Sequence, residues 1–274
     1  MNIEYVNSQN ESINLSDFPY CIQEPESLLG HKWAYTALES YNGGGVITNF
    51  RQEIREKKFQ ISIWADDQED FSTKMKRLLD AFDIDVIQKT AGKLYCNDTY
   101  LKCFIIESEP SEYEEDFYTT EQTFTIVAEN PMWINEKTFV FMSTNHTDIG
   151  FEYPHDFPIE YHIPESGEGI VENGSLKGCE FRLTINGPVT NPAIYIGGHR
   201  YGVIASANAG EYIEIDSRAK TVKKVGTGET NLFNNRVKES DIFHPISAGV
   251  NAVTWENEIS FEIGLYEERS CAAW

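Results

Sequence analysis

The chain is poor in basic residues. It has 22 Lys and Arg against 44 Asp and Glu among 274 residues, which gives a formal net charge of -22. Proteins that bind nucleic acid neutralise its phosphates with clustered Lys and Arg. Anionic membrane surfaces attract the same kind of cluster. The sequence contains no such cluster, which argues against both ligands. The acidic excess favours solubility, or a passage that DNA crosses without sticking.

Long apolar runs are also lacking. No stretch approaches the roughly 20 residues that a membrane-spanning helix needs. Residues 1–5 lack the basic and apolar parts of a signal peptide, so we expect the chain to be made and kept in the cytoplasm. The five cysteines have no Cys-x-x-Cys spacing, which predicts reduced thiols, with a bond between Cys96 and Cys103 across a turn as the alternative.

Signatures of catalysis and metal binding are missing as well. The sequence has no Gly-x-Ser-x-Gly elbow, no cysteine in a nucleophile signature, and six histidines without metal-site spacing. Carboxylate pairs, which a glycosidase needs, occur by chance in so acidic a chain. We therefore expect no enzymatic activity, catalytic residue, metal or cofactor, and keep a glycan-degrading enzyme only as an alternative.

The first half combines strands with one helix. Residues 59–64 alternate between apolar and polar, as half-buried strands do. Residues 66–83 have capping aspartates and then helical apolar spacing, which predicts a helix. A hairpin is predicted over 93–106, followed by an acidic connection over 109–116 and a strand over 117–127.

Three consecutive glycines, Gly43, Gly44 and Gly45, interrupt this half. Their low conformational order predicts a mobile loop. A phosphate-binding loop would need a following helix and usually a lysine, and the sequence offers neither.

The second half has many short alternating strands separated by glycine-containing turns. This pattern, without helical periods, predicts an antiparallel β-sandwich. The break at Asn130-Pro131 places the boundary near 135, so the predicted domains are 1–135 and 136–274. Aromatic residues exposed on such a sandwich would stack on sugar rings; otherwise they fill the core or an oligomer interface. The aromatic candidates are Trp133, Tyr195, Tyr201, Trp255 and Trp274.

An ordered set of segments then points to a family. The segments are 210–218, 220–222, 231–234, 240–246 and 249–251. Together they resemble the C-terminal domain of siphophage distal tail proteins, with a strand bearing Asp and Arg, a basic strand, an Asn-Leu-Phe segment and two characteristic turns. Residues 130–133 resemble the domain link of that family. The chain departs from the family pattern at 270–274, where a proline before the terminal aromatic residue would be expected.

The resemblance implies a mainly β fold with one α-helix in the N-terminal domain. Residues 1–135 would form a ring-forming belt domain, a split β-barrel-like structure with a long β-hairpin. Residues 136–274 would form a galectin-like antiparallel β-sandwich. The implied function is that of a structural, non-enzymatic distal tail protein. Such a protein forms a homohexameric ring at the phage tail tip, which connects the tail tube to the baseplate and leaves a channel for DNA.

The resemblance also implies partners and a location. The partners would be further copies of the chain, the tail tube protein, a tail-associated lysin or tail fibre hub protein, and a receptor-binding protein or host glycan. The ring would be assembled in the host bacterial cytoplasm and reside at the virion tail tip. The alternative function is a carbohydrate-binding adhesin module that recognises host cell-wall polysaccharide.

Interface residues are predicted at two places. The glycine loop, Gly43 to Gly45, would become ordered against a neighbouring copy. The 93–106 hairpin would extend the sheet of an adjacent subunit. Its interface candidates are Leu94, Tyr95, Leu101 and Phe104. The alternative for both places is an ordinary solvent-facing role.

Overall fold

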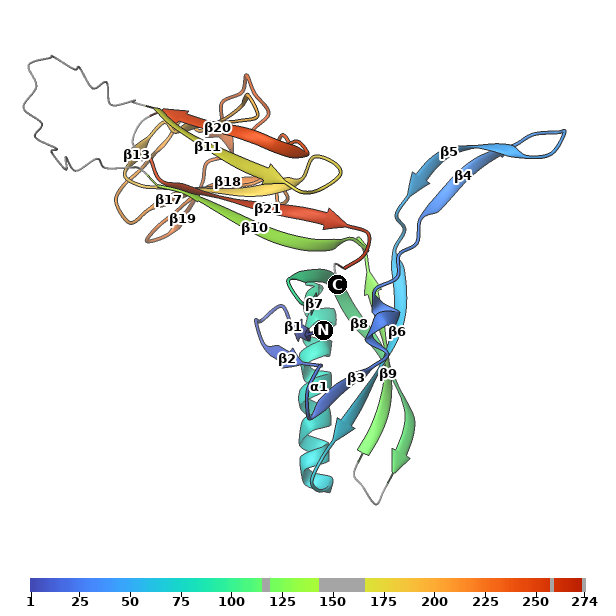
Figure 1. Ribbon diagram of the computed structural model, residues 1–274. Coiled ribbons are helices and arrows are strands. Elements are labelled where there is room, and N and C mark those ends of the chain that lie inside the picture. The colour runs from blue at the N-terminus through green and yellow to red at the C-terminus, as the bar shows by residue number, and fades with distance from the viewer. Residues whose placement is uncertain (115–118, 143–165, 257–258, 273–274) are drawn as a thin grey trace, which may run out of the picture. The chain divides into compact units, whose positions relative to one another are not determined.

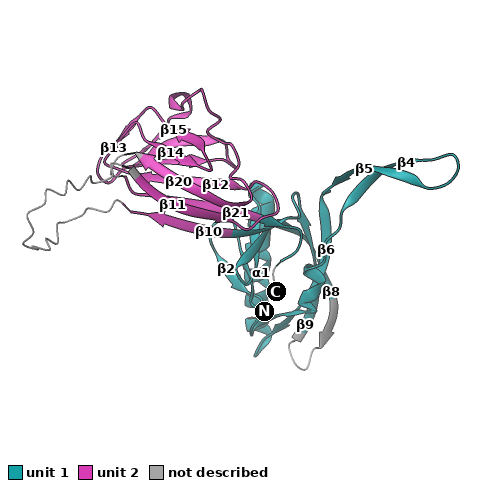
Figure 2. Cartoon of the chain, turned by 45° about the horizontal axis from the view of Figure 1, so that its top comes forward, with its two compact units in different colours: residues 1–135, 268–274 teal, residues 136–267 magenta. Residues whose placement is uncertain are grey.

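The computed structural model describes residues 1–114, 119–142, 166–256 and 259–272 (Figure 1). The chain divides into two compact units, residues 1–135 with 268–274 and residues 136–267 (Figure 2). It enters the second unit within β10 (Trp133–Phe141) and returns within β21 (Phe261–Arg269). The predicted second domain included residues 268–274, whereas the structure groups them with unit 1, where Ala272 belongs to the buried cluster. That the units are independent domains stays a prediction.

Unit 1 is built of antiparallel strands and one long helix. Its strands pair in the order β2-β1-β7-β8, with β8 also paired to β9, β9 to β6, and β6 to β3. The elements are β1 (Ile3–Val6), β2 (Ser12–Asn14), β3 (Tyr20–Gln23), the 3-10 helix η1 (Pro25–Leu28), β4 (Ala34–Glu39), β5 (Gly45–Arg51), β6 (Arg55–Trp64), α1 (Gln68–Gln88), β7 (Gly92–Cys96), β8 (Thr99–Glu114) and β9 (Thr119–Ala128).

Helix α1 is the only α-helix among the described residues, in agreement with the predicted fold class. The Asp67 side chain caps its N-terminus by accepting a hydrogen bond from the backbone N–H of Asp70 at 2.8 Å. The helix ends at Gln88, five residues later than predicted, and is followed by the C-cap Lys89 in the left-handed conformation (φ 55°). In the last turn the apolar side chains of Val86 and Ile87 are exposed, so they do not continue the apolar face of the helix. Apolar periodicity therefore missed the last turn, whose buried residue is the polar Asp85.

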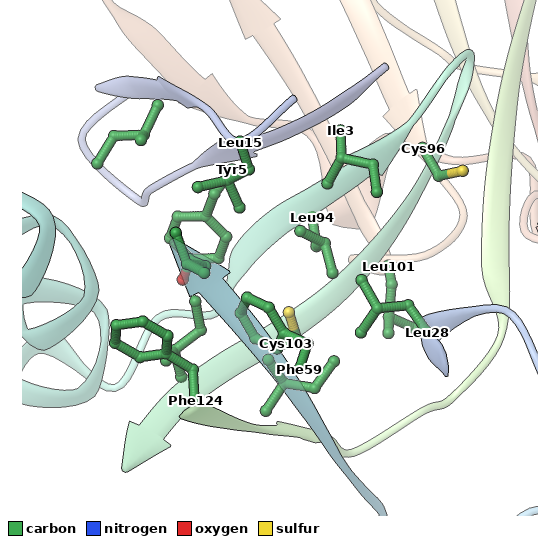
Figure 3. Packing of buried hydrophobic residues seen from close by; sticks show 14 of the residues in the cluster. Ile3, Tyr5, Leu15, Leu28, Phe59, Leu94, Cys96, Leu101, Cys103 and Phe124 are labelled. Carbon is green, nitrogen blue, oxygen red and sulfur yellow. The ribbon is translucent and has the colours of Figure 1, made fainter. Parts of the chain in front are cut away.

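The core of unit 1 lies between α1 and the sheet (Figure 3). The ring of Tyr5 meets Phe82 edge-on with centroids 5.1 Å apart, and Phe82 meets Phe124 in the same way at 5.3 Å. The Tyr5 hydroxyl donates to the buried carboxylate of Asp85 at 2.6 Å, which satisfies both groups away from water. Aromatic contacts between α1, β1 and β9 thus fix the helix on the sheet.

The described cysteines are free thiols. In the register of β7 and β8, Cys96 lies opposite Thr99 and Cys103 lies opposite Gly92. The two thiols therefore do not face each other across the turn (Figure 3). The alternative of a Cys96–Cys103 bond is wrong.

The predicted acidic connection is also wrong for residues 109–114. Strand β8 runs through Glu114, and its backbone pairs with β9 along this stretch. Two register shifts, between Ile105 and Glu107 and between Pro110 and Glu112, mark irregularities in the ladder. Backbone pairing therefore outweighs the poor strand propensity of the acidic residues.

Unit 2 is a sandwich of two antiparallel sheets. One sheet has the order β19-β18-β17-β12-β21-β10, and the other has the order β11-β20-β14-β15. Phe181, Leu183 and Ile263 from the first sheet pack with Ile194 and Val253 from the second in one buried cluster. The elements are β11 (Ser166–Asn173), β12 (Glu180–Asn186), β13 (Val189–Thr190), β14 (Ala193–Ile196), β15 (His199–Gly202), β16 (Ser206–Ala207), β17 (Tyr212–Asp216), β18 (Thr221–Val225), β19 (Glu229–Asn231), the 3-10 helix η2 (Phe233–Asn235) and β20 (Gly249–Glu256).

The buried thiol of Cys103 predicts alkaline sensitivity. Burial raises its pKa from 9.0 to about 12. Between pH 9 and pH 12 the folded state keeps the thiol proton that the unfolded state has lost. The free energy of unfolding is therefore unaffected by this thiol below pH 9 and falls as the pH rises above it. The loss is about 1 kcal/mol at pH 10. Thermal melts at pH 8 and pH 10 should show a smaller drop for Cys103→Ala than for the unsubstituted chain, and equal drops would contradict this assignment.

Candidate assembly interface

Strands β4 and β5 form a two-stranded arm (Figures 1 and 2). Among the described residues they pair only with each other, and every residue of β5 is exposed. An isolated two-stranded hairpin is marginally stable in water at best. The arm therefore lacks the packing that normally stabilises a hairpin of this kind.

Apolar side chains occupy both faces of this arm. Cross-strand partners share a face and successive residues alternate between faces. The pairs Tyr35–Phe50 and Ala37–Ile47 lie on one face, and the pair Leu38–Val46 lies on the other. The large apolar side chains among these residues are 51–69% exposed: Tyr35, Leu38, Val46, Ile47 and Phe50. Contiguous exposed apolar surface of this kind marks an interaction site, and here it is two-sided.

A β-bulge sits in the middle of the arm. Thr36 pairs with Asn49 and Ala37 pairs with Ile47, so Thr48 is the extra residue of β5. The Thr48 hydroxyl donates to the Thr36 carbonyl at 3.1 Å. The outer backbone edges of both strands are unpaired within the described chain, which leaves two edges open to strands of a partner.

The predicted glycine loop is the tip of the arm. Gly43 and Gly44 have φ values of 89° and 77°, which L side chains rarely adopt. A Cβ on Gly45 would lie 2.6 Å from the Leu38 carbonyl oxygen. The three glycines therefore shape a tight turn. Their predicted contact with a neighbouring copy stays a prediction.

The second predicted interface lies inside unit 1. Leu94 and Leu101 face each other across β7 and β8 and are buried, while Tyr95 and Phe104 are half-buried. The outer edge of β7 is already paired with β1. The hairpin therefore extends the sheet of its own chain, and Leu94 and Leu101 already serve its own core (Figure 3).

Sequence reasoning missed the arm although a signal was present. β-branched and aromatic residues flank the glycine turn on both sides, and strands joined by such a turn form hairpins. An apolar strand is normally expected to be buried, so its exposure is not visible in the sequence.

The aromatic residues that were candidates for sugar stacking are mostly in the cores. Trp133, Tyr201 and Trp255 are buried, Tyr195 is half-buried, and Trp274 lies outside the described residues. Within the described ranges no three His, Cys, Asp or Glu side chains are placed to hold a metal ion. No helix in that same part of the chain is long and apolar enough to cross a membrane.

Comparison with known proteins gives matches only in structure. No family model matches the sequence, and no curated protein matches it. The fold is similar to that of the Dit protein of phage SPP1, described as a paradigm of the hub adsorption apparatus in phages that infect Gram-positive bacteria. That match has 13% identity and a TM-score of 0.64 and covers 98% of each chain.

Two further matches come from the baseplate of phage p2 in its activated conformation. The calcium structure matches with 13% identity, and the strontium structure with 14%. Both have a TM-score of 0.66 and cover 99% of each chain. Over nearly its whole length, the chain therefore has the fold of a phage distal tail protein.

Proposed function

We propose that the chain is a structural subunit of a phage tail tip, where six copies close into a ring between tail tube and baseplate. The observation that carries the proposal is the arm, whose apolar faces and backbone edges are uncovered in the single chain. A second copy that covers these surfaces supplies the packing that the hairpin lacks. The shared fold with a phage hub protein and with baseplate chains supports this role.

An arm that reaches from one copy to the next accounts for a ring. An arm that binds a different surface on the next copy makes a head-to-tail contact, and head-to-tail contacts close into rings when the rotation allows. Exposed apolar side chains elsewhere on unit 1 are candidates for the receiving surface: Ile54, Trp64 and Ile87. Each copy then gives one arm and receives one.

The net charge fits a passage for DNA. A formal charge of -22 per chain is multiplied in a closed assembly. A bore lined by like charge repels phosphates and lets a duplex slide without binding. The other proposed partners, a tail tube protein and a lysin or receptor-binding protein, would sit on the two faces of the ring.

The mass of the purified protein in solution tests the proposal. Light scattering should give about six times the chain mass of 31.3 kDa, and negative-stain images should show rings with a central hole. A strictly monomeric protein across the accessible concentration range would refute the ring.

A further inference from the structure

A glycine in the middle of β21 creates a hollow on the outer face of the larger sheet of unit 2. Residues of β21 alternate, with Phe261, Ile263 and Leu265 in the core and Glu262 and Gly264 on the opposite face. At Gly264 this face has no side chain. The result is a hollow of about 120 Å³.

Neither backbone nor packing requires this glycine. Its φ is not positive, and a Cβ built on it would meet only Arg182 atoms at 3.8 and 4.0 Å, which is ordinary contact. Gly167 is different, because its Cβ would lie 2.0 Å from the Trp255 ring. A glycine inside a strand weakens it, and often marks a place where a ligand approaches closely.

The wall of the hollow is polar. Its side chains come from β10, β12 and β21: Glu136, Thr138, Arg182, Thr184, Glu262 and Tyr266. They provide carboxylate acceptors, a guanidinium donor and hydroxyls that both donate and accept. A few convergent polar groups can fix the orientation of a bound small molecule.

The guanidinium of Arg182 lies between an acidic and an aromatic neighbour. Its Nε lies 3.8 Å from Asp216, and its centre lies 5.7 Å from the Tyr266 ring. Arg218 covers the same ring at 4.4 Å. Burial raises the pKa of Tyr266 to about 12, so its hydroxyl stays protonated at neutral pH. The hollow therefore offers a charged donor and a neutral hydroxyl side by side.

A second hollow lies on the same face of the sheet. Cross-strand pairing runs from Gly264 through Arg182 and Asp216 to Thr221. Thr221 borders an open depression of about 380 Å³ together with Asn231 and Phe233. Three strand spacings separate Gly264 from Thr221, or about 14 Å. The polar face between them suits an extended ligand better than a single ring.

From these observations we propose that the outer face of this sheet binds a neutral oligosaccharide, with one sugar unit seated over Gly264. Glu136 and Glu262 in the first hollow disfavour polyanions, and the nearby Arg182 disfavours cations, as do Lys220 and Lys223 in the second hollow. What remains favoured is an uncharged ligand rich in hydroxyls, which pairs with all of these groups. The site is independent of the ring, because its lining comes from one unit of one chain.

The test uses the full chain and two leucine variants. On an array of neutral, amino and acidic glycans, the unsubstituted protein should bind neutral members. Calorimetry with the best-bound neutral trisaccharide should then show at least a tenfold loss of affinity for Gly264→Leu, because leucine fills the hollow. Gly30→Leu is the matched control: its Cβ would meet only the end of the Arg55 side chain, at 3.9 Å, and affinity should be unchanged.

Folding is checked separately from binding. Gly264→Leu should melt at the same temperature as the parent or higher, since it replaces a strand glycine without a clash. Thr184→Val removes one hydroxyl at nearly constant shape and should weaken binding severalfold. Binding of no glycan, of acidic glycans only, or of a lysine-rich peptide in their place would overturn the proposal, as would full affinity in Gly264→Leu. None of these results bears on the mass of the assembly.

Discussion

Replacing residues 35–50 with a short Gly-Ser turn is expected to give a monomer of about 30 kDa, a little below the 31.3 kDa of the full chain, because the arm holds the proposed ring together. The splice is feasible because Ala34 and Arg51 are cross-strand partners, about 5 Å apart at Cα. The removed residues contribute nothing to the buried cluster of unit 1. Light scattering measures the mass, and the melting temperature should stay within a few degrees of the parent.

A double variant that keeps the arm tests whether its apolar side chains, and not only its backbone, are needed for assembly. Tyr35→Thr with Phe50→Thr keeps two β-formers at a cross-strand pair but removes two exposed rings. Assembly should weaken at least a hundredfold, because buried aromatic anchors dominate interfaces. Val140→Thr is the control, since Val140 is a comparably exposed strand residue of unit 2, and it should assemble normally. Rings that survive arm replacement would show that other surfaces hold the copies together.

The strands and helix that pack on a core were predictable from the sequence. The alternation over 59–64 lies in β6, where Phe59, Ile61 and Ile63 are buried. The hairpin of the arm could have been predicted from its glycine turn, but its exposure could not, because apolar strands are normally buried within their own chain. An alternating pattern predicts that one face of a strand is buried, but it does not tell whether the same chain or another copy covers that face.

The hollow at Gly264 could not be predicted from the sequence for a different reason. Its residues come from positions 136 to 138, 182 to 184 and 262 to 266, which only the order of β12, β21 and β10 brings together. Nothing local distinguishes Gly264 from a strand glycine that packing requires, such as Gly167. Three of the aromatic residues chosen from the sequence as sugar platforms, Trp133, Tyr201 and Trp255, are buried, since large apolar rings on alternating strands mostly fill the core.

Lys137→Ala is expected to destabilise unit 2 far more than the loss of a surface ion pair would. The Glu267 carboxylate is 0% exposed, and its Oε1 lies 2.9 Å from the Lys137 ammonium group and accepts from the Gly174 N–H at 2.7 Å. Its Oε2 has no hydrogen-bond partner among the residues that the structure describes. Without the lysine, a buried carboxylate is left with one neutral donor, which costs about 3 kcal/mol. The melting temperature should fall by about 10 °C.

The double variant Lys137→Met with Glu267→Leu tests whether the loss comes from the orphaned charge. Apolar groups of similar volume avoid desolvating a carboxylate altogether, so the double variant should recover most of the lost stability. Lys58→Ala is the surface control. Lys58 pairs with Glu109 at 3.5 Å, both side chains are more than half exposed, and the change should cost less than about 1 kcal/mol. If Lys137→Ala melts like Lys58→Ala, water reaches Glu267, and the ion pair does not hold β10 and β21 together. If the double variant is no more stable than Lys137→Ala, the loss reflects packing of the lysine stem and not an unpaired charge.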